Sequence, residues 1–207
     1  MTGLVLGSAS HARRKILSDA GLNFDVMKPL IDEDEVKQRL RADNLPVSGL
    51  ALQLAQEKAL SLSRNYPGSP NSPGPLVIGA DQILLHDNMQ YDKPADIAAA
   101  RQMLRRLRGD THQLLCAVCV ACGDDILWSC QDSAELTMRD FSDSFLDRYL
   151  AYAGDGICDS VGAYQLELLG AHLFSEIRGD YFTILGLPLL PLLSFLRQHP
   201  EYEVTFA

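Results

Sequence analysis

The sequence predicts an α/β fold, with a mixed sheet of parallel and antiparallel strands flanked by helices. Short apolar segments typical of strands alternate with segments whose apolar residues recur at helical spacing. This alternation favours parallel strands joined by helices. One pair of strands is separated only by "GDD", residues 123–125, which predicts a hairpin and therefore an antiparallel pair.

Length and composition fit one domain of moderate size over residues 1–207, or two closely joined lobes. The chain has 207 residues, 47% of them hydrophobic, which is enough to bury a sizeable core. Its formal charge of −9 argues against nonspecific nucleic-acid binding, which needs a basic surface. The richest apolar run, 181–197, contains prolines and is too short to span a bilayer, and the first ten residues lack the features of a signal peptide. We therefore expect a cytoplasmic protein with neither a membrane nor a nucleic-acid partner.

The first part of the chain alternates strand and helix. Ser10 is a suitable helix N-cap, and Gly21 stands where a C-cap glycine is expected. In chain order, the predicted elements are a strand at 3–8, a helix at 10–20, a strand at 23–30, two helices of which the second covers 48–66, and an exposed loop at 67–75.

The second part contains the hairpin and two further segments with clear helix signals. A helix is expected to begin at Pro94 and to end at Gly109, and Ser142 is expected to cap another. In chain order, the predicted elements are a strand at 76–86 interrupted at 79–81, a turn at 87–90, the helix at 94–109, the hairpin within 111–140, the helix at 142–154, and short strands with a turn at 178–180 before a last helix.

Five cysteines include three in the spacing of an iron–sulfur motif, "CAVCVAC". No fourth cysteine follows at ferredoxin spacing. The surrounding residues predict a buried strand, on which Cys116 and Cys122 point to one face and Cys119 to the other. Small core residues are therefore favoured over cluster ligands, and the odd number of cysteines argues against a disulfide framework.

Two acidic residues are candidates for chemistry. Asp81 lies within the apolar run "LVIGADQILL", where an ionised carboxylate is costly unless it is compensated. A structural aspartate that caps a turn and a metal ligand or general base at a strand end are equally compatible with this setting. Glu33 belongs to an acidic run that by itself indicates a solvated loop, although Asp81 and Glu33 together can share a divalent cation with substrate phosphates.

The stretch "GSASHARRKIL", residues 7–17, is the clearest candidate for an anion site. A strand, a serine-rich turn and a helix start offer free backbone N–H groups, and Ser8 and Arg13 add donors suited to phosphate oxygens. The alternative is a solvent-exposed helix face, on which positive charge near the helix N-terminus is unfavourable. Lys58 and Lys93 carry little weight alone, although Lys93 precedes a predicted helix start.

Several motifs in register resemble the Maf family of nucleoside triphosphate pyrophosphatases. They are "LVLGSASHARRKIL", "IDE" at 31–33, "EKA" at 57–59, "VIGADQ" at 77–82, "DKP" at 92–94, "MLRRLRGDTHQ" at 103–113 and the segment 162–189. The resemblance implies two lobes around a central cleft. It also implies hydrolysis of a nucleoside triphosphate to the monophosphate and pyrophosphate with Mg²⁺ or Mn²⁺. A homodimer is left open.

The resemblance also implies roles for individual residues. Asp81 matches the catalytic acid or base, and Glu33 matches the acidic residue that assists the metal or the water. The positions that match the phosphate site are Ser8, Arg13, Lys58 and Lys93, the last of which we group with the catalytic residues.

Three positions bear on the base of the nucleotide. The dTTP and UTP branch of the family has Thr where this chain has Gln82 and Gln where it has Glu167, whereas the 7-methyl-GTP branch has Gln or Lys and Glu. Ala12 stands where the 7-methyl-GTP branch usually carries an aromatic residue. Two of three positions thus favour 7-methyl-GTP, although "GDYFTILGLPL" is more like the other branch and dTTP or UTP stay open.

Two alternatives from other functional classes remain. A nucleotide-binding regulator of cell division, acting in septum formation, would keep the pocket with little or no turnover. A redox or metal-cluster protein would use "CAVCVAC".

Overall fold

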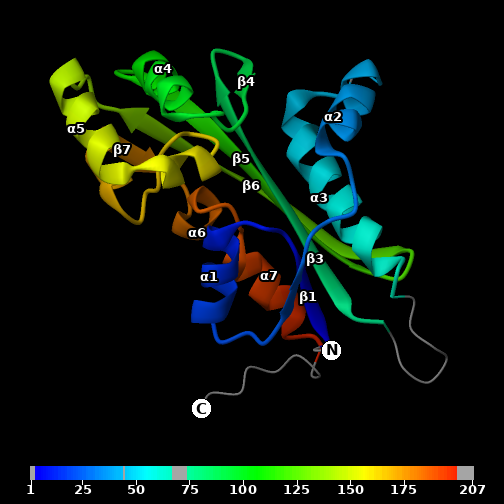
Figure 1. The fold of residues 1–207 in the computed structure, drawn as a ribbon. Coiled ribbons are helices and arrows are strands. Elements are labelled where there is room, and N and C mark those ends of the chain that lie inside the picture. Colours follow the sequence, from blue (N-terminus) through cyan, green and yellow to red (C-terminus); the bar gives the residue numbers. More distant parts are fainter. Residues whose placement is uncertain (1–2, 44, 67–73, 200–207) are drawn as a thin grey trace. The chain divides into compact units, whose positions relative to one another are not determined.

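One mixed sheet runs through residues 3–43, 45–66 and 74–199, which are the residues that this computed structural model describes (Figure 1). Its strands follow the order β2-β1-β3-β5-β6-β7, with β4 paired to β3. β1 is parallel to β2 and β3, whereas β3 with β4 and β6 with β7 are antiparallel. The strands are β1 (Leu4–Gly7), β2 (Asp25–Met27), β3 (Leu76–His86), β4 (Met89–Tyr91), β5 (Thr111–Cys122), β6 (Asp125–Met138) and β7 (Phe174–Arg178).

Helices flank this sheet, and the predicted mixed α/β class is confirmed. No helix in the described part of the chain is long and apolar enough to cross a membrane. The α-helices are α1 (His11–Asp19), α2 (Glu33–Ala42), α3 (Val47–Ser63), α4 (Ile97–Leu107), α5 (Asp143–Ala153), α6 (Tyr181–Ile184) and α7 (Leu189–Leu196), and short 3-10 helices cover Asp155–Asp159 and Leu169–Leu173.

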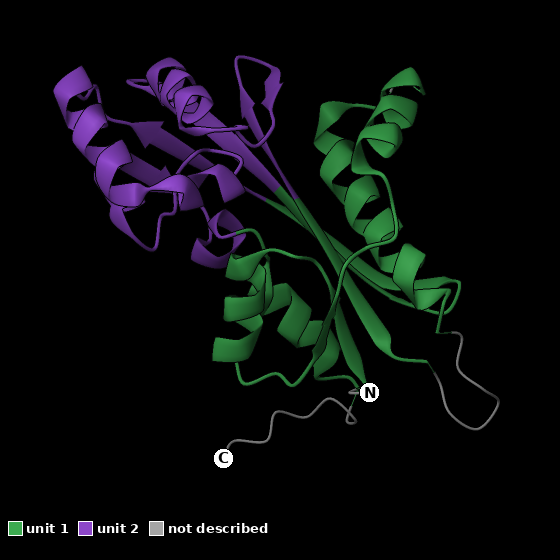
Figure 2. Ribbon diagram, viewed as in Figure 1, with its two compact units in different colours: residues 1–81, 116–132, 186–207 green, residues 82–115, 133–185 purple. Residues whose placement is uncertain are grey.

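The chain divides into two compact units (Figure 2). Unit 1 comprises Met1–Asp81, Cys116–Asp132 and Gly186–Ala207, and unit 2 comprises Gln82–Leu115 and Ser133–Leu185. Three of the four boundaries fall inside β3, β5 and β6, so each of these strands contributes residues to both units, and the fourth falls between α6 and α7.

In unit 1, α2 and α3 lie on one side of the strands, and α1 and α7 lie on the other (Figure 1). The core is built from apolar residues of β1, β3, β5 and α3 that are almost fully buried. The predicted cap of the first helix is confirmed, because the Ser10 side chain accepts a hydrogen bond from the Arg13 N–H. Gly21 adopts a left-handed φ of 76° after that helix, as its C-cap position predicts.

In unit 2, α4 and α5 are joined by ion pairs. Arg105 and Arg108 both bind Asp143 at the start of α5, at 2.7 and 2.9 Å, and Arg101 pairs with Asp147. The predicted Ser142 cap is confirmed by its hydrogen bond from the Phe145 N–H.

Three predicted details are wrong. The turn expected at 87–90 covers only Asp87 and Asn88, because β4 begins at Met89. β3 is not interrupted at 79–81 but continues from Leu76 to His86 through the glycine and the aspartate. The helix expected from Pro94 begins instead at Ile97, because the Asp96 side chain caps it by accepting from the Ala99 N–H at 2.7 Å. Most of the predicted loop at 67–75 lies outside the described residues.

Candidate active site

Three charged side chains of unit 1 meet around one nitrogen. The Lys58 Nζ atom lies 2.6 Å from Asp81 Oδ1 and 3.0 Å from Glu33 Oε1. The side chains of Lys58 and Asp81 are 6% and 11% exposed, whereas that of Glu33 is 49% exposed. We call these three residues the Lys58 cluster. Two carboxylates share one ammonium, so the cluster carries a formal charge of −1.

A glycine in β3 allows this cluster to form. A Cβ atom at Gly79 would lie 2.1 Å from the Ala55 carbonyl oxygen and 2.7 Å from the Ala59 nitrogen, both in the backbone of α3. Only glycine permits such a close approach of helix and strand. Gly79 pairs in register with Gly7 of β1, which also faces α3. α3 therefore brings Lys58 down to the strand residue Asp81.

Electrostatics keep the exposed member of the cluster ionised. Burial opposes the ionisation of Glu33, but the Lys58 ammonium, which is both near and hydrogen-bonded, outweighs it and lowers the pKa of Glu33 below its ordinary value. Lys37 and Arg13 act in the same direction. Glu33 is therefore a carboxylate at neutral pH.

The turn after β1 places Ser8 and Arg13 together. The Ser8 Oγ atom accepts hydrogen bonds from the Ser10 N–H and from Arg13 Nη1, both at 3.2 Å. These two bonds use the acceptor capacity of the hydroxyl, so its proton remains to be donated. Ser8 is 5% exposed, and its O–H is the part of the side chain that can still donate to a ligand.

Arg13 is fixed by the protein itself. Nη1 also donates to the Ala80 carbonyl at 2.9 Å, and Nε donates to the Gly186 carbonyl at 2.7 Å. Nη2 makes no hydrogen bond to the described residues, so this end of the fork is the part that can meet a ligand. Lys15, by contrast, pairs with Asp19 on the exposed face of α1, as expected for ordinary helix surface.

The Lys58 cluster fits a divalent metal in donor chemistry. Carboxylate oxygens are ligands that Mg²⁺ prefers, and one or two of them suffice when substrate phosphates complete the shell. Only one oxygen of each carboxylate contacts Lys58. Among the described residues, no group of three or more His, Cys, Asp or Glu side chains is arranged to hold a metal ion. A metal held by the Lys58 cluster would therefore have only Glu33 and Asp81 as protein ligands, and substrate phosphates would have to complete its shell.

The other predicted site residues are divided between the two units. Ala12 is half-buried in the first turn of α1 in unit 1. Lys93, Gln82 and Glu167 belong to unit 2, where Lys93 and Glu167 are exposed. The expectation that Lys93 stands at a helix start is wrong, because α4 begins four residues later behind its own Asp96 cap.

Gln82 has a defined orientation within unit 2. Its Nε2 atom donates to the backbone carbonyls of Thr183 at 2.9 Å and of Ile184 at 3.0 Å. Both amide protons are used by these bonds, so the side chain offers only its Oε1 acceptor to a ligand.

The cysteines of "CAVCVAC" lie on β5, as the strand prediction requires. Cys116 and Cys119 are completely buried, and burial raises the pKa of each thiol to about 12. Both are therefore small core residues of β5, as the strand pattern favours.

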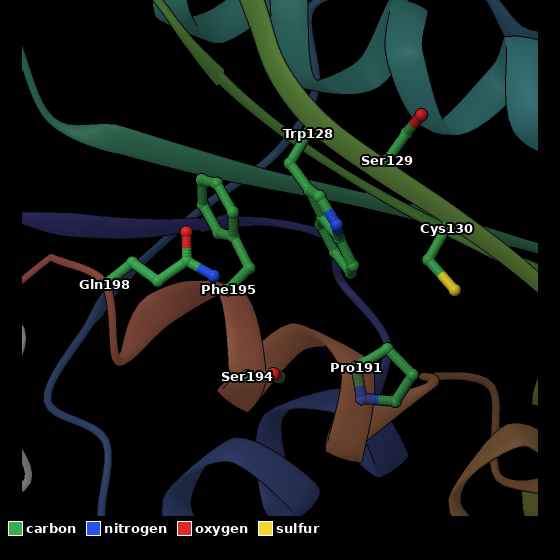
Figure 3. A pocket seen from close by; sticks show the side chains of 7 residues that line it. All are labelled: Trp128, Ser129, Cys130, Pro191, Ser194, Phe195 and Gln198. Carbon is green, nitrogen blue, oxygen red and sulfur yellow. The ribbon is translucent and has the colours of Figure 1, made fainter.

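A separate pocket of unit 1 contains none of the predicted site residues (Figure 3). Its volume is about 370 Å³. The ring of Trp128 on β6 stacks on that of Phe195 on α7, with centroids 5.3 Å apart. The residues that line it are Trp128, Ser129, Cys130, Pro191, Ser194, Phe195 and Gln198.

Two residues important for the site escaped the sequence interpretation. Gly79 was expected to interrupt its strand, although a glycine inside an apolar strand also signals close backbone approach, which is its role here. Gly186 supplies the carbonyl that binds Arg13. No local pattern could have indicated that bond, because 173 residues separate the two partners.

Comparison with known proteins agrees with the sequence resemblance. A family model described as "Maf-like protein" matches residues 3–199. A "Nucleoside triphosphate pyrophosphatase" of Granulibacter bethesdensis is 46% identical, covering 97% of this chain and 99% of the relative. A "7-methyl-GTP pyrophosphatase" of Rhizobium meliloti is 44% identical, covering 94% of this chain and 95% of the relative. The solved structure of the Staphylococcus aureus Ham1 protein aligns over 66% of this chain and 72% of that chain, with 14% identity and a TM-score of 0.40, too distant a likeness to bear on the site.

Proposed function

Since the chain belongs to the family of Maf-like proteins, we propose that it is a nucleoside triphosphate pyrophosphatase. It hydrolyses a non-standard or modified nucleoside triphosphate to the monophosphate and pyrophosphate, with Mg²⁺ or Mn²⁺ as cofactor. The observation that carries the proposal is the Lys58 cluster beside β3, because it provides ionised carboxylates and a buried cation in the same unit as the Ser8 and Arg13 donors.

The residues divide the work of phosphoryl chemistry. The Ser8 hydroxyl and the free end of the Arg13 fork donate to phosphate oxygens, and Lys58 and Lys93 add positive charge as negative charge builds up on those oxygens. Asp81 orients the attacking water or accepts its proton as the water attacks the α-phosphorus. A metal held by Asp81 and Glu33 would supply further neutralisation of phosphate charge.

The base preference follows from the acceptors in unit 2. Gln82 presents only Oε1, because its amide protons are used by backbone carbonyls, and Glu167 is an exposed carboxylate in the same unit. A guanine edge offers N1–H and N2–H donors to such acceptors, and the positive charge of 7-methylguanine adds an attraction to Glu167. This chemistry favours 7-methyl-GTP, with UTP and dTTP as weaker substrates.

The direct test is hydrolysis of a nucleotide panel. Wild-type protein with Mg²⁺ or Mn²⁺ should release pyrophosphate, with kcat/KM highest for 7-methyl-GTP among 7-methyl-GTP, UTP, dTTP and GTP. Asp81→Asn should lower kcat by about a thousandfold, since general-base and charge effects of this size are common. Asp19→Asn is the matched control, because it makes the same chemical change in the exposed Lys15 ion pair.

The outcomes separate the enzyme from a binding protein. Tight nucleotide binding without turnover, together with a cell-division effect that survives Asp81→Asn, would favour the regulator. Failure to release pyrophosphate from any nucleotide would refute the proposed pyrophosphatase activity.

A further inference from the structure

The Lys58 ammonium contacts both of the carboxylates that would hold a metal. It lies 2.6 Å from Asp81 and 3.0 Å from Glu33, which are distances of direct ion pairs. Lys58 and Asp81 are almost fully buried, so water screens their attraction little. The two carboxylates therefore already hold one cation that belongs to the chain.

We propose that Lys58 is a built-in counter-ion that keeps divalent metal away from Asp81 and Glu33 until a polyphosphate arrives. The proposal rests on the proposed function, because it concerns the metal of that reaction. A divalent ion that entered beside the ammonium would be repelled by this positive charge at close range. The attraction that remains is also small, because the Lys58 cluster has a net charge of only −1.

A polyphosphate changes this balance. Its oxygens are an alternative partner for the ammonium, and Lys58 lies on a flexible four-carbon stem that can turn toward them. Once the ammonium pairs with phosphate, both carboxylates lose their shared cation, and a metal can bind them together with phosphate oxygens. Metal and nucleotide are therefore expected to bind cooperatively, each weakly without the other.

The first experiment measures Mn²⁺ alone by equilibrium dialysis, with no nucleotide present. Lys58→Met removes the charge and keeps an apolar stem, and we expect it to bind Mn²⁺ at least about tenfold more tightly than the wild type. Lys58→Arg keeps the charge and should stay as weak as the wild type. The double variant Glu33→Gln, Lys58→Met should lose this increase in Mn²⁺ affinity, because one of the two carboxylates is gone. Equal affinity of wild type and Lys58→Met would overturn the proposal.

A second experiment uses no Lys58 variant, so its result does not depend on such a variant being folded. Without nucleotide, wild type and Asp81→Asn should bind Mn²⁺ equally weakly. Asp81-dependent binding should appear only when inorganic tripolyphosphate is added. Asp81-dependent binding of Mn²⁺ alone, or its absence with tripolyphosphate, would refute the counter-ion role.

These measurements are independent of turnover. A protein that binds Mn²⁺ as expected but hydrolyses no nucleotide would keep the counter-ion role and lose the proposed function. A protein that hydrolyses nucleotides but binds Mn²⁺ through Asp81 without any nucleotide would keep the proposed function and lose the counter-ion role of Lys58.

Discussion

Each unit buries a close pair of polar side chains, and the two pairs differ in charge. In unit 1, Lys58 and Asp81 are buried as a pair of ions. In unit 2, His112 and Tyr164 are buried as neutral groups, with His112 Nε2 2.7 Å from the Tyr164 hydroxyl. A buried charge persists only with a close partner, whereas a neutral pair needs only a hydrogen bond. Burial alone therefore does not mark a reactive site, and the charge of what is buried is the better guide.

The state of His112 has a clear physical cause. Burial, and secondarily the nearby His86, lower the pKa of His112 to about 4. Its Nδ1 atom is buried and has no hydrogen-bond partner among the described residues, so a second proton on the ring would have no acceptor there. Unit 2 therefore maintains a neutral imidazole at physiological pH, where unit 1 maintains an ion pair.

The sharpest way to break the charged site is Gly79→Ala. The added Cβ would collide with the backbone of α3, which cannot move without separating Lys58 from Asp81. We expect the free energy of unfolding to fall by about 3 kcal/mol or more, as overpacking against backbone is costly. Urea denaturation measures this, and pyrophosphate release should be lost as well. Gly156→Ala is the control, because nothing lies within 4 Å of a Cβ there. Equal stability of both variants would contradict the close approach.

The neutral site can be tested by pH. Unfolded His112 binds a proton below about pH 6.5, whereas the folded protein resists this until about pH 4. The unfolded state thus binds more protons in that window, and stability falls as the pH falls. The loss should be about 2 kcal/mol between pH 7 and pH 5, a range that lies above most carboxyl titrations. His112→Phe should remove this part of the pH dependence in urea denaturation. An unchanged slope would show that His112 is not buried as a neutral group.

These two sites show what the sequence could and could not predict. The Ser10 cap, the hairpin and the buried strand of "CAVCVAC" follow from local patterns, and the structure confirms them. The grouping of Asp81 with Lys58 depends on a helix meeting a strand 23 residues away, which no local pattern describes.

The roles at the candidate site remain predictions that the contacts only support. Sequence comparison could point to Gln82, but not to the fact that its amide protons are taken by the backbone at Thr183 and Ile184. Long-range hydrogen bonds of this kind decide which end of a side chain a ligand meets.

Gln82 is expected to give the smallest effect but the most specific one. It is a neutral side chain of unit 2 whose Nε2 atom binds the backbone, whereas its Oε1 atom is left for a ligand. Gln82→Glu turns two donors into acceptors that face backbone carbonyls, and we expect a loss of about 1 kcal/mol in the free energy of unfolding. Gln82→Thr, which introduces the residue of the dTTP and UTP branch, removes the Oε1 acceptor without placing a negative charge beside those carbonyls. Stability should therefore change less than in Gln82→Glu, while the kcat/KM ratio of 7-methyl-GTP to UTP falls. A Gln82→Glu variant as stable as the wild type would contradict the backbone bonds. An unchanged kcat/KM ratio in Gln82→Thr would instead show that Gln82 does not select the base, which would leave that role to Glu167.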